Sequence, residues 1–154
     1  MRRVGVMDAA THAVIKLRHS ENEATDKPME SGAMMTIERL EAFCAAWNRH
    51  DIDGLMSFMT DDCVFESSGG PDACGTRYAG REAVRRGYMG AWEAVPDAQW
   101  SVARHFISGD RGLSEWIFTG THSDGRRIEV TGCDVFTFRG DKIVVKNSYR
   151  KQRS

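Results

Sequence analysis

Features that mark specialised classes of protein are missing from this sequence. No apolar run approaches the roughly 18 residues that a membrane span needs, so we expect no membrane partner. The four cysteines include no Cys-x-x-Cys pair, and the five histidines lie too far apart to form a metal-ligand motif. A net charge of -1 argues against nucleic acid as the main partner. These absences predict a cytoplasmic protein with reduced thiols, no metal and no cofactor.

What is present is the composition of a globular domain. The 154 residues, 41% hydrophobic and 28% charged, can form one domain with a proper core and are few for two. Residues 1–33 differ from the rest, because a weakly apolar start is followed by a polar stretch that Pro28 and Gly32 break. We expect them to be an N-terminal extension, partly disordered or a loose helix, before a folded domain at 34–154.

The first half of this domain carries helical signals. Thr36 and Asp51 are each placed to cap a helix, since their side chains can accept from backbone N–H groups of the first turn. Pro96 cannot continue a helix and ends a third apolar stripe. The expected elements are helices over 36–48, 51–59 and 80–95, a strand over 63–67, a glycine-rich loop over 69–75 and a strand over 98–107.

The second half predicts a sheet. Three strands are expected from Gly112 to Lys151, with tight turns at Gly125 and Gly140, where glycine can supply a positive φ. Helices followed by antiparallel strands indicate an α+β fold with the helices on one face of the sheet. Alternation turns Trp116 to one face and Ile117 to the other, so both faces are apolar. The face without helices therefore predicts a homodimer through the outer face of the sheet.

Asp134 is the residue that fits its strand least well. It shares a face with apolar side chains at alternate positions, including Val130, Phe136 and Phe138. An ionised carboxylate is costly in such surroundings unless it has a partner. Three roles stay open for it: a structural ion pair, a polar anchor for a ligand, or a catalytic acid or base.

Four short segments follow one another in an order typical of a known family. They are Ala-Trp-Asn-x-x-Asp at 46–51, Asp-Asp-Cys-Val-Phe at 61–65, Tyr-Ala-Gly-Arg-Glu-Ala-Val at 78–84 and Asp-Val-Phe-Thr-Phe-x-x-x-Lys-Ile at 134–143. With the order of elements, they resemble the SnoaL-like branch of the nuclear transport factor 2-like superfamily over residues 35–153. The resemblance implies a cystatin-like cone, in which a curved antiparallel sheet wraps around three N-terminal helices and encloses a deep apolar pocket, usually in a homodimer.

This superfamily implies a fold more strongly than a function. Its members include ketosteroid isomerases, polyketide cyclases, limonene epoxide hydrolases, dehydratases and proteins without catalysis. Asp134 matches the protonated aspartic acid that donates a hydrogen bond to the oxyanion in ketosteroid isomerases. The tyrosine of that oxyanion hole falls at Phe43 and the proton-moving aspartate at Ser67, while the catalytic aspartate of polyketide cyclases falls at Ser148. Each known catalytic set is therefore broken, and only Asp134 survives.

The resemblance also suggests which side chains line the pocket. It turns Glu115, Lys146, Ser148 and Arg150 inwards, where Lys146 could pair with Asp134. Hydropathy alone would turn Lys146 and Arg150 outwards, because Ile143 and other apolar residues look like the buried set of that strand. Both orientations stay open, and the aromatic candidates could equally be plain core. The expected ligand-binding residues are Phe43, Trp47, Phe65, Ser67, Tyr88, Trp92, Glu115, Lys146 and Ser148.

Two functional hypotheses follow. The first is a cofactor-free lyase, isomerase or hydrolase that acts on a small apolar molecule and uses Asp134 as its catalytic residue. The second is a non-catalytic homodimer that binds a small ligand or another protein. The second is motivated by the missing catalytic base, and a second ionisable group beside a bound molecule would favour the first.

Overall fold

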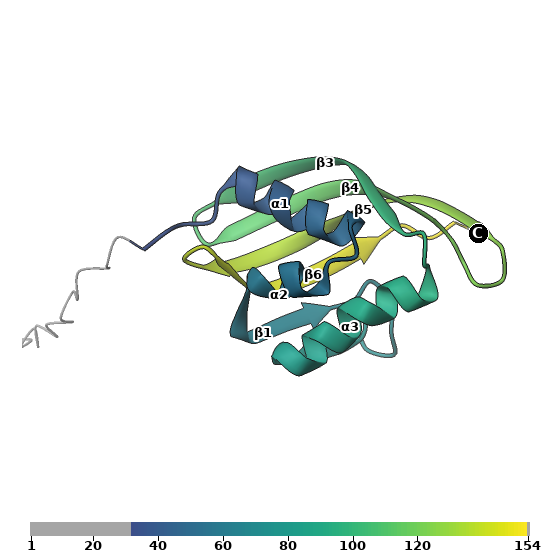
Figure 1. Cartoon of the computed structure of the whole chain (residues 1–154), viewed down its shortest axis with the longest axis horizontal. Helices are drawn as coiled ribbons and strands as arrows, with labels where there is room; N and C mark the ends of the chain where they lie inside the picture. The colour runs from purple at the N-terminus through teal and green to yellow at the C-terminus, as the bar shows by residue number, and fades with distance from the viewer. Residues whose placement is uncertain (1–31, 154) are drawn as a thin grey trace, which may run out of the picture. The chain divides into compact units, whose positions relative to one another are not determined.

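The first helix begins at the cap that the sequence predicts. In the computed structural model, which describes residues 32–153, the Thr36 hydroxyl accepts a hydrogen bond from the backbone N–H of Arg39 at 3.3 Å. Helix α1 follows over Ile37–Asn48 (Figure 1). The extension expected at 1–33 lies outside the described residues except for its last two.

Helices α2 (Ile52–Ser57) and α3 (Arg81–Ala94) also lie where they are expected. The Asp51 carboxylate accepts from the backbone N–H of Gly54 at 2.8 Å and so caps α2. Helix α3 ends two residues before Pro96. All three helices lie on the same side of the sheet, as Figure 1 shows, so the sheet has one covered and one uncovered face.

The sheet has six strands in the order β2-β1-β6-β5-β4-β3. Their bounds are β1 Met59–Glu66, β2 Arg77–Ala79, β3 Gln99–Ser108, β4 Arg111–Thr121, β5 Arg127–Arg139 and β6 Lys142–Arg150. Strands β3 to β6 form the expected antiparallel meander, and the α+β class with a curved sheet is confirmed. Two details differ from expectation: the short strand β2 was not expected, and β1 runs parallel to β6.

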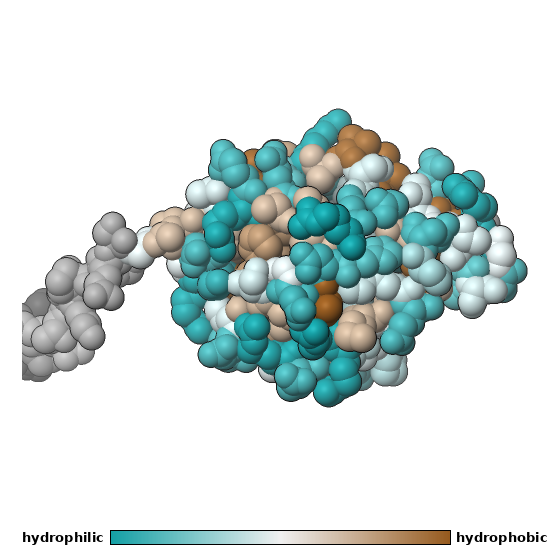
Figure 2. All heavy atoms as spheres, in the orientation of Figure 1, coloured by the Kyte–Doolittle hydropathy of each residue, from teal (hydrophilic) through white to brown (hydrophobic). Residues whose placement is uncertain are grey.

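The inner face of the sheet is the one that the helices cover. It carries the buried side chains of Ser114, Trp116, Asp134 and Phe136, whereas Glu115 and the other odd-numbered positions of β4 lie on the outer face. Figure 2 shows the helix side of the molecule, where hydrophilic side chains predominate. No helix within residues 32–153 is long and apolar enough to cross a membrane.

A β-bulge in β6 decides which of its side chains point inwards. Phe138 pairs with Ile143, but the preceding residue of β5, Thr137, pairs with Val145, so Val144 is an extra residue in β6. The insertion resets the alternation along the strand. Ile143 and Lys146, three positions apart, are therefore both buried on the inner face. The outward orientation that hydropathy suggested for Lys146 is wrong for this reason.

Candidate functional site

The centre of the inner face is a buried ion pair. The Lys146 Nζ lies 2.7 Å from the Asp134 Oδ1, and each residue exposes only 5% of its surface. Strands β5 and β6 are neighbours, and the bulge in β6 turns the lysine towards the aspartate. The pairing considered from the sequence is thus present. A buried pair of this kind is stable only when its remaining polar atoms also have partners.

Two further side chains supply those partners. The Trp116 indole N–H donates to the Asp134 Oδ2 at 3.0 Å. The Ser148 hydroxyl donates to the Asp134 Oδ1 at 2.6 Å and accepts from the Lys146 Nζ at 2.7 Å. Lysine and indole nitrogens can only donate, so this pattern of partners suits an ionised carboxylate that accepts from all three neighbours. It does not suit the protonated, donating aspartic acid of ketosteroid isomerases.

Aromatic rings surround the ion pair. The Lys146 Nζ lies 5.3 Å from the ring centroid of Trp47 and 5.0 Å from that of Phe65, both within cation–π range. Tyr88 packs against both rings and is fully buried. Burial raises the pKa of the nearby Cys44 thiol to about 12, and the negative charge of Asp134 acts in the same direction. The pair therefore lies in a region of low polarity, where electrostatic interactions are strong.

A cavity of about 240 Å³ opens on the inner face beside this pair. Lys146 and Ser148 form part of its wall, and Asp134 lies directly behind them. Most of the remaining wall is apolar or small, and no aspartate or glutamate of the described residues belongs to it. The other wall residues are Ser67, Ser68, Gly69, Ala91, Ala94, Val95, Trp100, Trp116, Phe118, His122, Ile128 and Arg150.

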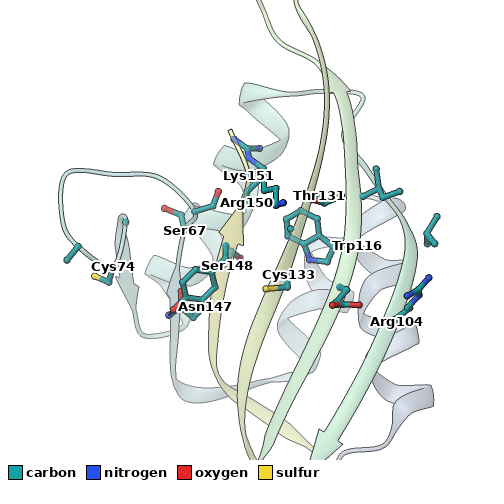
Figure 3. A pocket seen from close by; sticks show the side chains of 18 residues that line it. Ser67, Cys74, Arg104, Trp116, Thr131, Cys133, Asn147, Ser148, Arg150 and Lys151 are labelled. Atoms are coloured by element: carbon teal, nitrogen blue, oxygen red, sulfur yellow. Dashed lines mark hydrogen bonds between the residues drawn. The ribbon is translucent and has the colours of Figure 1, made fainter. Parts of the chain in front are cut away.

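A second hollow of about 900 Å³ lies on the outer face of the sheet. Figure 3 shows it between the loop that carries Cys74 and the strand that carries Arg104, with Cys133 and Asn147 on the sheet between them. It is larger than the inner cavity, and the two share the wall residues Ser67, Ser68, Trp116, Ser148 and Arg150. We call it the outer groove. Its size alone does not make it the chemical site, because the buried ion pair faces the other side of the sheet.

The candidates from the sequence are distributed over three places. Ser67, Lys146 and Ser148 line the inner cavity, with Asp134 behind them. Phe43, Trp47, Phe65 and Tyr88 are buried core beneath the ion pair, and Trp92 packs on Trp47 and stacks on His50. The expectation that Glu115 lies on the pocket side is wrong, because Glu115 pairs in register with Cys133 and lines the outer groove.

The Ser67 hydroxyl already makes two hydrogen bonds within the protein, which limits its availability to a ligand. It donates to the Gly69 carbonyl at 2.6 Å and accepts from the Thr76 backbone N–H at 3.1 Å. It therefore holds both ends of the glycine-rich loop together.

Sequence reasoning missed several wall residues of the inner cavity. Trp100 and His122 contribute from β3 and from the turn after β4. Trp116 and Phe118 share a face by simple alternation, and this was the only signal that could have indicated them. Trp100 pairs in register with Phe118 and so lies on the same face, and His122 directly follows the end of β4; neither the register nor the strand end was known from the sequence.

Comparison with known proteins identifies the family. A family model described as "SnoaL-like domain" matches residues 40–146, and no curated protein sequence matches the chain. A protein of unknown function with a cystatin-like fold from Xanthomonas campestris is 21% identical, with a TM-score of 0.68 over 77% of this chain and 92% of the other.

Two further solved structures were determined with small molecules. A hypothetical protein with a ketosteroid isomerase-like fold from Catenulispora acidiphila, in complex with trimethylamine, is 19% identical, with a TM-score of 0.65 over 75% of this chain and 86% of the other. TerC, co-crystallised with polyporic acid, is 18% identical, with a TM-score of 0.63 over 75% and 90%. These similarities show the fold alone. Together with the family model over 40–146, they establish that this chain belongs to the SnoaL-like domain family.

Proposed function

We propose that this chain binds a small, largely apolar molecule in the inner cavity and holds one hydrogen-bond acceptor of that molecule against Lys146. The observation that carries the proposal is the incomplete set of partners around the lysine. An ammonium group has three N–H donors. Two of them are used by Asp134 and Ser148, and no third oxygen partner exists among residues 32–153. A ligand carbonyl or hydroxyl would complete the set.

The dimensions of the cavity fit a ligand with one ring. A cavity of about 150 Å³ lined by apolar side chains is known to hold benzene. The 240 Å³ here leaves room for a ring with one or two substituents. Two members of the same fold, in complex with trimethylamine and with polyporic acid, support the idea that small molecules bind this type of protein.

Acetophenone is a suitable probe, because it combines one ring with one carbonyl acceptor. We expect millimolar acetophenone to shift the indole N–H resonance of Trp100, which lines the inner cavity and not the outer groove. Ala94→Phe should fill the cavity mouth and abolish the shift, whereas Ala73→Phe in the outer groove should leave it unchanged. A Trp100 resonance that does not respond to saturating acetophenone would rule out the proposed function.

Catalysis is a second candidate, favoured by the position of Lys146. A charged donor in an apolar cavity stabilises negative charge that develops on a carbonyl oxygen. Asp134 would then act by holding Lys146 in place, and His122 is the only imidazole on the cavity wall of the described part. With Lys146 as the donor to the carbonyl oxygen and His122 as the acid or base, the cavity would suit a cofactor-free lyase, isomerase or hydrolase.

Proton exchange tests this second candidate. An enzyme of this kind should exchange the methyl protons of acetophenone for deuterium in D₂O faster than buffer does, and both Lys146→Met and His122→Gln should reduce that rate. If acetophenone binds but its methyl protons do not exchange, the protein binds the ligand without catalysing proton transfer from it.

We also propose that two copies associate through the outer face. Phe106 and Tyr149 are 57% and 55% exposed there, and Val102 at the rim of the outer groove is 64% exposed. Exposed apolar groups of this size usually mark an interface. Light scattering at micromolar concentration should give twice the chain mass of 17.3 kDa, and Phe106→Glu should halve it. A monomeric wild type would contradict the proposal.

The remaining expectations are proposals of the same kind. The folded domain is proposed to be 34–154, so deletion of 1–33 should leave the melting temperature nearly unchanged. A drop of many degrees would show that the extension stabilises the domain. The four cysteines form no disulfide, which supports a cytoplasmic location.

A further inference from the structure

Within residues 32–153, Arg150 is the only arginine or lysine besides Lys146 on the wall of the inner cavity. It lies on β6, four residues beyond Lys146, where it lines the inner cavity and also borders the outer groove. Its guanidinium carbon is 4.9 Å from the ring centroid of Phe118 on the inner face. Residues four apart on an extended strand have Cα atoms about 13 Å apart, so the two cations enter the cavity wall at different points along β6.

The two cations differ in how they are neutralised. Lys146 is paired with Asp134, but no carboxylate within residues 32–153 comes within 4.0 Å of a nitrogen of Arg150. No acidic side chain of the described residues lines the cavity either. The wall therefore carries one positive charge in excess, and it is located at Arg150.

The surroundings of Arg150 leave its donors available. The Phe118 ring covers one face of the planar guanidinium, which leaves the N–H groups at its edge free to bind. Partial burial also lowers the pKa of Arg150, which reflects lost hydration of the cation. A guanidinium presents paired N–H groups that match the two oxygens of a carboxylate.

We propose that Arg150 is the specificity-determining residue of the inner cavity and selects small apolar ligands that carry a carboxylate. This inference rests on the proposed function, because it places the ligand in the same cavity. The ring of the ligand would lie against Phe118 and Trp100, its carboxylate on Arg150, and any acceptor at its far end on Lys146. Arg150 would thus set the charge of the ligand, and the buried pair would orient its other end.

A matched pair of probes separates charge from shape. 4-Acetylbenzoate and 4-acetylbenzamide have nearly the same size, and only the first is an anion. Affinities measured by titration of the Trp100 indole resonance should favour the benzoate by about 10-fold or more, which is the effect of one charge-assisted hydrogen bond. Arg150→Gln should remove this preference, because the affinity for the benzoate should fall about 10-fold or more and that for the benzamide by clearly less.

The control variant is Arg104→Gln, which removes an arginine from the outer groove. It should keep the full preference for the benzoate. Equal affinities of the wild type for both probes, or a preference that survives in Arg150→Gln, would overturn the role of Arg150 while the proposed function stands. A preference lost only in Arg104→Gln would overturn it too, because the anion would then bind on the outer face. If neither probe nor acetophenone binds, the proposed function fails as well.

Discussion

The two faces of the sheet stabilise charged side chains in different ways. On the inner face, the Asp134 carboxylate accepts hydrogen bonds from Trp116, Lys146 and Ser148 and is almost fully buried. On the outer face, Glu115 stands on the neighbouring strand, is exposed, and has no ion-pair partner among residues 32–153. The Asp134 carboxylate is tolerated on the inner face because three side chains donate hydrogen bonds to it, and the Glu115 carboxylate on the outer face because it is exposed. The inner face is therefore specified residue by residue, whereas the outer face is open to a partner.

The largest expected effect comes from removing a charge on the inner face. Asp134→Asn leaves the Lys146 ammonium buried without its counter-charge, so the free energy of unfolding should fall by about 3–5 kcal/mol. Glu115→Gln, the matched change on the outer face, should alter it by no more than about 0.5 kcal/mol. Urea denaturation of both variants measures the contrast. Similar effects on the two faces would remove the basis of the comparison.

A medium effect is expected at Gly132, which lines the outer groove and pairs in register with Trp116 of the inner face. A Cβ atom at this position would meet the Trp116 ring and the Tyr149 carbonyl, so the Asp134 partners would have to shift. Gly132→Ala should therefore destabilise the protein by about 1–3 kcal/mol.

Gly90 provides the control for this substitution. It lies in α3, where a Cβ atom would meet nothing within 4 Å, so Gly90→Ala should stabilise the protein by about 0.5–1 kcal/mol. Thermal unfolding of the two variants should shift the midpoint in opposite directions. A neutral Gly132→Ala would show that the two faces are not separated by close packing.

The smallest effect concerns pH. His105 on β3 makes a 2.7 Å hydrogen bond with the buried Ser114 hydroxyl, and burial lowers the pKa of this imidazole below its ordinary value of 6.5. The unfolded chain then binds the proton more readily, so the contribution of His105 to stability is complete above pH 6.5 and decreases as the pH falls. Unfolding at pH 7.5 and 5.5 should show a smaller pH dependence in His105→Gln than in wild type. An unchanged dependence would assign it to other groups.

Much of the fold could be predicted because its signals are local. Thr36 and Asp51 cap helices through their own side chains, and Pro96 excludes helix by its ring. Strand β1 was expected to begin at Cys63 rather than Met59, because Asp61 and Asp62 read as a turn. Both are exposed, and Asp62 binds Arg139 across the sheet surface, so these polar residues fit a strand.

The site could be predicted only in part. Asp134 could be identified because alternation places its carboxylate on the same face of β5 as apolar side chains, where an unpaired charge is costly. The orientation of Lys146 could not be settled, because the bulge at Val144 breaks the alternation that the argument needed. Glu115 was misplaced by the resemblance, although its neighbour Trp116 already occupied the inner face. A distant resemblance predicts the position of a strand more reliably than the face of the sheet on which a given side chain lies.

The most direct test of this account is the double-mutant cycle of Asp134 and Lys146. Asp134→Asn and Lys146→Met alone should each lower the free energy of unfolding by about 3–5 kcal/mol, since each leaves one buried charge without its partner. The double variant should recover much of that loss, because neither charge remains. Urea unfolding of all four proteins gives the coupling free energy. Small, additive effects would mean that Asp134 and Lys146 are not a buried pair, and would contradict the account of the inner site.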